Sequence, residues 1–138
     1  MRLFSPNKDL GVQSFIVKLL NNNCRELEQL MEGPRIEGRV RLTLVVMVVP
    51  VQEKKLAVDR TFTAVTKEFS STGVALVLNG PLGLDEVVLG FRLQGGVTWV
   101  RAKSKHLSPM GGGFFQLGFR LIERLVVGDH PELESLEF

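Results

Sequence analysis

Two short groups of residues have the side-chain types and the spacing needed to bind one ligand between them. Arg35 and Arg39 lie four residues apart in the segment PRIEGR, where two guanidinium groups can donate hydrogen bonds to the same ligand. Glu68, Ser70 and Gly73 follow in the segment EFSSTG. A type I turn is predicted from Ser70 to Gly73, because such turns favour a hydroxyl residue at the first position and glycine at the last. A carboxylate would then lie at the mouth of a strand.

Both groups also have a simpler interpretation. The two arginines can be solvated side chains beside the end of a helix, and the carboxylate of Glu68 can pair with a nearby surface lysine. The sequence leaves these alternatives open.

A basic stripe is predicted on a later strand. Arg101, Lys103 and Lys105 alternate along the chain and would point to the same side as Trp99. A basic stripe with an aromatic side chain can bind a nucleic-acid backbone. It can also extend an anion site, or it can be the solvated face of an edge strand that charge protects from association. The formal net charge of +2 argues against general affinity for nucleic acid or anionic lipid, so any anion site must be local.

Residue types that serve catalysis or metal binding are present without the necessary spacing. The histidines are far from each other in sequence and from the single cysteine, Cys24, so the spacing of metal ligands is missing. The sequence therefore predicts no metal, no cofactor and no enzymatic activity. The remaining titratable candidates, which have no recognisable partner, are His106, His130, Asp59, Asp85 and Asp129.

The whole chain fits one cytoplasmic domain. Its 138 residues can bury somewhat under ~70% of the extended surface without disulfides. The single cysteine cannot pair within the chain, and no signal-peptide pattern opens the sequence, which favours a reducing compartment. The longest apolar run, residues 42–51, is about half the ~20 residues of a membrane-spanning helix. We expect it to be a buried strand, with no insertion into a membrane.

Helices are predicted only at the two ends. Apolar residues at helical spacing predict a helix over residues 10–20, which Ser5 or Asp9 could cap and a run of three asparagines, residues 21–23, would end. Asn23 and Glu26 form a capping-box pattern that predicts a second helix up to Glu32. Residues 124–138 are acidic and are predicted to form a short helix or a loose tail.

Between these ends the apolar period is two, which is typical of strands. A long strand begins at Ile36, and its outer face becomes apolar at Val45, Met47 and Val49. We expect the N-terminal helices or a second subunit to cover that face. A tight hairpin is predicted at Gly95-Gly96, and a flexible turn over residues 108–113. The further strands are predicted at residues 61–69, 74–78, 86–94, 97–106 and 114–122.

These elements predict a mainly β protein, a six-stranded antiparallel barrel with N-terminal helices. We expect a helical segment in residues 1–33, the barrel in residues 34–123, and an acidic tail or short helix in residues 124–138.

The two candidate groups together resemble the motifs of the PilZ family, bacterial β-barrel domains that bind the second messenger cyclic di-GMP. That family has RxxxR and then, a few dozen residues later, (D/N)xSxxG. This chain has Arg35 and Arg39, followed by Glu68, Ser70 and Gly73. A third segment, QLGFRLI at residues 116–122, is similar to the closing strand of such domains. Glu68 departs from the family's aspartate or asparagine, since it keeps the charge and adds a methylene.

The resemblance implies a cytoplasmic signalling receptor in which these five residues bind cyclic di-GMP. One guanidinium would contact a guanine and the other a phosphate. The segment could then become ordered and reposition the N-terminal helices toward a partner protein. The alternative is a degenerate PilZ-like adaptor that binds no nucleotide. Such an adaptor would form a homodimer or a hetero-complex through Val45, Met47 and Val49.

Overall fold

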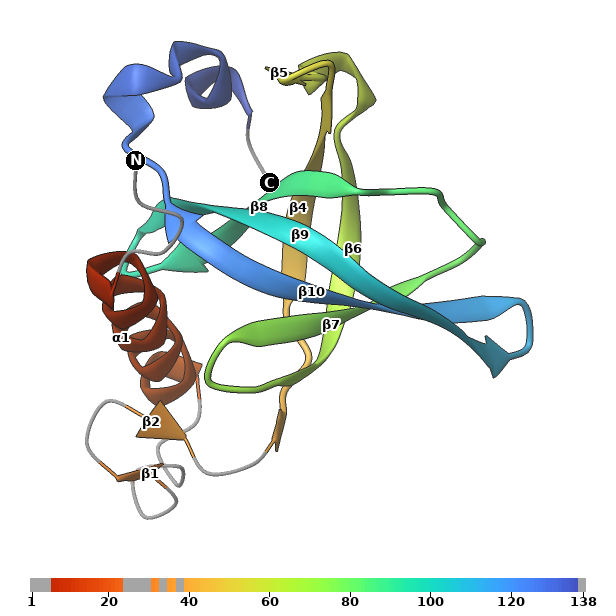
Figure 1. The fold of residues 1–138 in the computed structure, drawn as a ribbon, viewed down its shortest axis with the longest axis horizontal. Helices are drawn as coiled ribbons and strands as arrows, with labels where there is room; N and C mark the ends of the chain where they lie inside the picture. Colours follow the sequence, from red (N-terminus) through yellow and green to blue (C-terminus); the bar gives the residue numbers. More distant parts are fainter. Residues whose placement is uncertain (1–5, 24–30, 33–34, 37–38, 137–138) are drawn as a thin grey trace.

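The centre of the molecule is a closed, six-stranded antiparallel barrel (Figure 1). This computed structural model describes residues 6–23, 31–32, 35–36 and 39–136. The barrel strands follow the order β6, β7, β10, β9, β8 and β4, and the pairing of β4 with β6 closes the ring. The helix and strands are α1 (Pro6–Asn23), β1 (Met31–Glu32), β2 (Arg35–Ile36), β3 (Val40–Arg41), β4 (Val45–Gln52), β5 (Lys55–Leu56), β6 (Phe62–Phe69), β7 (Gly73–Leu78), β8 (Glu86–Leu93), β9 (Gly96–Gly111) and β10 (Phe114–Arg124). The prediction of a mainly β barrel is confirmed.

The long strand predicted from Ile36 is divided into short pieces. β3 and β4 both pair with β6, but residues 42–44 between them leave the regular ladder. The buried side chain of Thr66 forms hydrogen bonds with the backbone of this irregular stretch. Its hydroxyl oxygen accepts a hydrogen bond from the Leu44 N–H at 2.8 Å and donates one to the Leu42 carbonyl at 2.6 Å.

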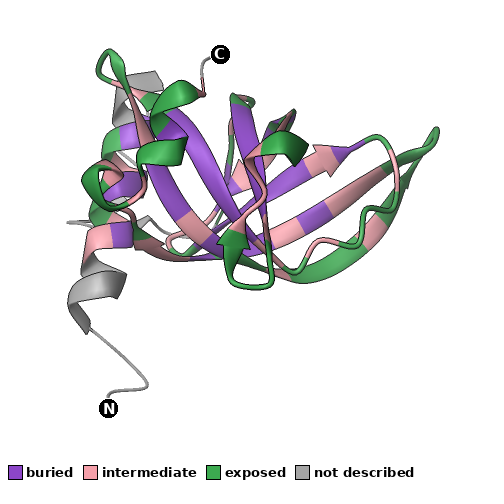
Figure 2. Cartoon of the chain, turned by 90° about the horizontal axis from the view of Figure 1, so that it is seen from above, coloured by how far each residue is buried: buried purple, intermediate pink, exposed green. Residues whose placement is uncertain are grey.

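One apolar side of α1 packs into the main hydrophobic core inside the barrel. Phe15, Ile16 and Leu19 are fully buried, and the ring of Phe15 meets that of Phe91 edge-on at 5.3 Å between centroids. In Figure 2 the buried residues, in purple, are found on the helix as well as on the barrel strands. The helix prediction for residues 10–20 is confirmed, although the helix begins at Pro6, a residue suited to a first helical turn.

Two predictions about the N-terminal region need correction. The first helix ends at the asparagine run as predicted, but it includes the run and ends at Asn23, because asparagine costs at most about 0.7 kcal/mol in a helix. The predicted second helix does not reach Glu32, because Met31 and Glu32 form β1, which pairs with β2. Its other residues, 24–30, and the proposed cap Ser5 lie outside the described part of the chain.

A second hydrophobic core lies on the outer face of β4, β8 and β9. Met47, Val49 and Trp99 are 5%, 0% and 2% exposed, and Leu133 packs with them. Leu133 belongs to the C-terminal segment, which forms two 3-10 helices, η3 (Val127–Asp129) and η4 (Pro131–Ser135). The expectation that N-terminal helices or a second subunit cover this face is therefore wrong. The chain's own C-terminal segment covers this face. The segment contains leucines and valines between its acidic residues, and several of these apolar side chains pack on the second core.

Two hairpins differ from their predicted positions. The tight turn after β8 is centred on Gln94 and Gly95, with φ of 53° and 81°, and Leu93 pairs with Gly96. Positive φ at both central residues is the type I′ geometry, one residue earlier than predicted. The predicted flexible turn over 108–113 is mostly strand, because β9 continues to Gly111. No helix in the described part of the chain is long and apolar enough to cross a membrane.

Candidate functional site

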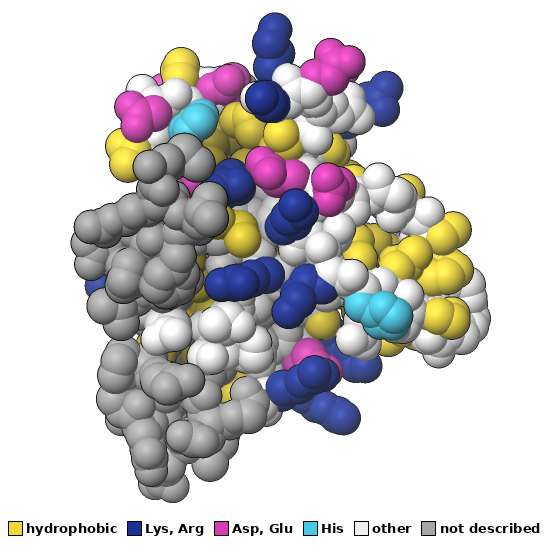
Figure 3. Space-filling view, in the orientation of Figure 1, with side chains coloured by type: hydrophobic (Ala, Val, Ile, Leu, Met, Phe, Trp, Pro, Cys, Tyr) yellow, Lys and Arg dark blue, Asp and Glu magenta, His cyan; other side chains and the backbone are white. Residues whose placement is uncertain are grey.

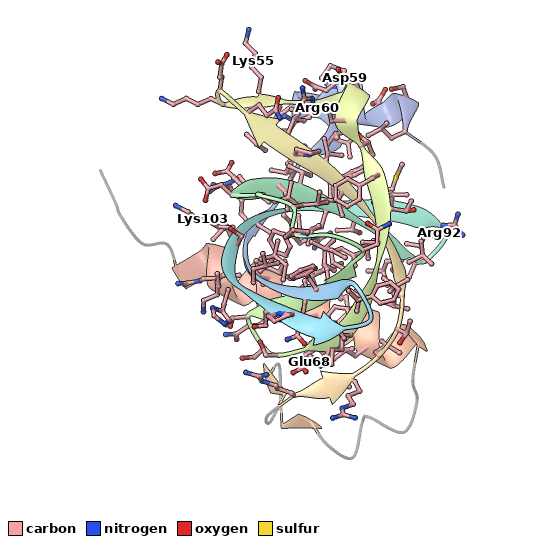
Figure 4. The ribbon with its side chains drawn as sticks, turned by 90° about the vertical axis from the view of Figure 1, so that its right-hand side faces the viewer. Lys55, Asp59, Arg60, Glu68, Arg92 and Lys103 are labelled. Carbon is pink, nitrogen blue, oxygen red and sulfur yellow. The ribbon has the colours of Figure 1, made fainter. Side chains whose placement is uncertain are left out.

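The pairing of β3 with β6 brings Arg39 to Glu68. Arg41 lies opposite Glu68 in the ladder, and Arg39 directly precedes β3. The Nη1 atom of Arg39 lies 3.0 Å from Oε2 of Glu68. The arginine side chain is 74% exposed and the glutamate side chain 14%, so the carboxylate is mostly covered while the guanidinium faces solvent. Figure 4 shows Glu68 at one end of the barrel, with Lys55, Asp59 and Arg60 at the other.

The segment from Ser70 to Gly73 reverses the chain between β6 and β7 beside this ion pair. The Ser70 N–H donates to the Gly73 carbonyl at 3.0 Å, and the Thr72 N–H lies 3.4 Å from the Ser70 hydroxyl oxygen. The Leu121 N–H of β10 donates to the Thr72 carbonyl at 2.9 Å. The turn is thus held on the neighbouring strand as well as by its own hydrogen bonds.

Gly73 is required for close packing rather than for an unusual backbone angle. Its φ is not among the positive values of the described residues. A Cβ atom on Gly73 would clash with the carbonyl oxygen of Phe119 on β10. The glycine therefore allows two backbones to approach, and the turn can lie directly against β10.

A surface cavity of about 390 Å³ opens beside the turn, within the ~300–1,000 Å³ typical of small-molecule sites. Arg39, Lys105 and Arg120 contribute cationic groups, and Glu68 contributes the lining carboxylate. The cavity therefore has a local excess of positive charge, although the net charge of the whole chain is small. Its lining residues are Arg39, Glu68, Phe69, Ser70, Thr72, Gly73, Val74, Ala75, Lys105, His106, Ser108, Gln116, Gly118, Phe119 and Arg120.

A β-bulge directs Lys105 to this cavity. His106 pairs with Gly118 and Ser104 with Phe119, which leaves Lys105 as the extra residue on β9. Bulges change the direction of a side chain and are frequent beside binding sites. Lys105 and His106 both line the cavity as a result. This agrees with the alternative in which the predicted basic stripe extends an anion site.

The rest of that stripe has a structural role. Arg101 donates to Oε2 of Glu123 from Nε at 3.0 Å and from Nη2 at 2.8 Å, and it lies 3.5 Å from Glu86. Over this region β9 is not an edge strand, because it pairs with β8 on one side and β10 on the other. The side chain of Trp99 is buried and cannot stack on a base. The edge-strand interpretation is therefore wrong for Arg101 and Lys103, and the nucleic-acid interpretation lacks its exposed aromatic side chain.

Four of the five predicted site residues lie around one cavity: Arg39, Glu68, Ser70 and Gly73. For Arg35 the structure gives the backbone in β2, and its side chain lies outside the described part. Arg120 and His106 were not assigned to this site from the sequence. A weak signal existed for Arg120, which lies two residues after Gly118 in the segment QLGFRLI and thus on the same face of its strand.

The protein-binding alternative loses two of its three contact residues. Met47 and Val49 are buried within the chain, and of the predicted surface only Val45, 55% exposed, faces solvent.

Among residues 6–23, 31–32, 35–36 and 39–136, no cluster of three or more His, Cys, Asp or Glu side chains could hold a metal ion.

No protein-family model matches this sequence, and a search of curated proteins finds no match. The barrel, the two motifs and the cavity are therefore the features that bear on the class of protein.

Proposed function

We propose that this barrel is a PilZ-type receptor that binds cyclic di-GMP and acts, without catalysis, as a bacterial cytoplasmic signalling domain. One observation carries the proposal. Arg39 and Glu68 are 29 residues apart in the chain, yet their side chains meet at 3.0 Å beside Ser70 and Gly73 on one cavity. The RxxxR and xSxxG motifs need this juxtaposition if one ligand is to contact both.

The chemistry of the cavity supports a ligand that combines phosphates with purine edges. Guanine N1–H and the N2 amino group donate hydrogen bonds, and the Glu68 carboxylate accepts them. A guanidinium can bind guanine O6 and N7 together or a phosphate oxygen pair, which are the two roles open to Arg39. The cations of Lys105 and Arg120 supply charge for two phosphates from the β9–β10 side.

Isothermal calorimetry with cyclic di-GMP tests this proposal. We expect binding at tens of micromolar or tighter, and we expect Arg39→Ala and Glu68→Gln each to weaken it about tenfold, because one base contact contributes ~1–3 kcal/mol. Arg41→Ala is the matched control, since Arg41 is an exposed arginine of β3 outside the cavity lining and should leave affinity unchanged.

The proposal fails if folded wild-type protein gives no heat with cyclic di-GMP at tens of micromolar. It also fails if Arg39→Ala and Arg41→Ala have the same affinity as wild type, because the ligand would then bind elsewhere.

A further inference from the structure

The β9–β10 hairpin extends beyond the barrel and exposes apolar side chains. The last residue of β9 that pairs with β8 is Lys103, and the strand continues to Gly111 with β10 as its partner. Figure 1 shows this ribbon projecting from the barrel. Leu107, Met110 and Phe114 are 37%, 43% and 49% exposed. They are three of the seven exposed large hydrophobic residues in the described part of the chain, so apolar surface is concentrated here.

The turn at the end of the hairpin contains no side chains. Gly111, Gly112 and Gly113 have φ of 96°, 64° and 85°, values that favour glycine. Met110 and Phe114, on either side of these glycines, are therefore the outermost side chains of the tip. Figure 3 shows apolar side chains gathered on this end of the molecule.

The outer part of the hairpin, residues 103–120, is also free of acidic residues. Residues 103–120 contain Lys103, Lys105 and Arg120 and no aspartate or glutamate, although the whole chain has 15 acidic residues. All three cations lie on the part of the hairpin nearer the barrel and are exposed. Lysine and arginine side chains gather on the face that β9 and β10 form (Figure 3). The hairpin thus has an apolar tip and a cationic base.

These features argue against a partner strand or a second copy of the chain. The bulge at Lys105 distorts the outer edge of β9, and Pro109 has no N–H to donate, so strand addition is disfavoured. Two copies whose hairpins packed side by side in the same direction would bring their cationic bases together, and like charges repel. An anionic partner that also accepts apolar side chains fits both the base and the tip, and a bilayer with acidic lipids is such a partner.

We propose that the β9–β10 hairpin docks this domain on an anionic membrane surface. Met110 and Phe114 reach the boundary between headgroups and acyl chains. Lys103, Lys105 and Arg120 lie five to seven residues behind the tip, where the negative surface potential of the bilayer attracts them; Lys105 and Arg120 also line the cavity. The docking is peripheral and reversible, as for other small apolar anchors combined with basic patches. It goes beyond the proposed nucleotide binding and does not depend on it.

Co-sedimentation of the full chain with lipid vesicles tests this inference. We expect binding to mixed phosphatidylcholine–phosphatidylglycerol vesicles, little binding to phosphatidylcholine alone, and weaker binding at high salt. The double variant Met110→Ser/Phe114→Ser should bind about tenfold more weakly, because it removes two apolar side chains that the lipid would bury. The matched control is Val45→Ser/Val126→Ser, which replaces two valines that are 55% and 66% exposed elsewhere.

Three results would overturn the inference: no sedimentation with acidic vesicles, equal sedimentation with neutral ones, or no difference between the tip variant and its control. Retention on single-stranded DNA that the tip variant leaves unchanged, together with unchanged vesicle binding, would assign the hairpin to polyanions in general. The fluorescence of the buried Trp99 reports whether each variant is folded. Neither tip residue lines the cavity, so a negative result here leaves the calorimetric test of cyclic di-GMP unaffected.

Discussion

Replacing Gly73 with alanine tests the close approach between the turn and β10. A glycine whose backbone angles suit any residue normally gains about 0.4–1 kcal/mol on mutation to alanine, because the unfolded chain loses freedom. At Gly73 the new methyl group would instead clash with the carbonyl oxygen of Phe119. Phe119 is a fully buried residue of a central barrel strand, so its backbone cannot move away freely. Overpacking of this kind costs about 1–3 kcal/mol, and we expect a net loss of about 1–2 kcal/mol.

Urea and thermal unfolding measure this loss. For a domain of this size about 1–2 kcal/mol corresponds to a melting temperature lower by roughly 3–8 °C. Gly83→Ala is the control, because a Cβ there meets nothing within 4 Å, and its stability should stay the same or rise slightly. The sign of the effect decides the question. If Gly73→Ala is as stable as wild type or more stable, the turn does not rest on β10 as described.

Three further substitutions test other contacts. Thr66→Val keeps the side-chain shape but leaves the Leu44 N–H without its acceptor, and urea unfolding should show a loss of about 1–3 kcal/mol; an unchanged midpoint would contradict this role. Gly90→Ala would place a methyl group 2.6 Å from the Trp99 ring, so we expect lower thermal stability and altered tryptophan fluorescence, whereas wild-type values would show that the ring can move. Truncation after Arg124 removes the segment that covers Trp99 and should shift its emission to longer wavelength; emission at the wild-type wavelength would mean that something else shields the ring.

Most strands of the barrel could be predicted because their periodicity reflects burial. The ranges predicted near β6, β7 and β8 differ from the observed ones by one residue at most. These strands place alternate side chains in a core, and that alternation is visible in the sequence. The long β9 was underestimated because its outer half projects from the barrel, where burial no longer constrains the residue pattern.

The cover of the second core could not be predicted from local pattern. The alternation of Met47 and Val49 indicated an apolar outer face on this strand. No sequence pattern near these residues predicts which segment covers that face. The covering residue Leu133 belongs to a segment so rich in acidic residues that its local composition indicates a tail. Contacts between residues this distant in sequence become visible only in three dimensions.

In the candidate site, too, some residues could be predicted from sequence motifs and others only from the three-dimensional structure. Motif order suggested that Arg39 and Glu68 share one rim, and the β3–β6 pairing places them in contact. Lys105 lines the cavity because of the bulge in β9. Arg120 lines it because β10 pairs with β7, which places Arg120 opposite Gly73. Neither the bulge nor this pairing of distant strands has a signature in a single sequence.

The ion pair between Arg39 and Glu68 would also set a chemical condition on the ligand that we propose for the cavity. A bare inorganic anion has no N–H to donate, so it can only add to the exposed donors of the guanidinium and leave the pair with Glu68 in place. A ligand that breaks the pair must donate to the mostly covered carboxylate, because a carboxylate left there without a donor is energetically unfavourable. A molecule that carries an anion and N–H donors together, as cyclic di-GMP does, would replace both halves of the pair in one exchange.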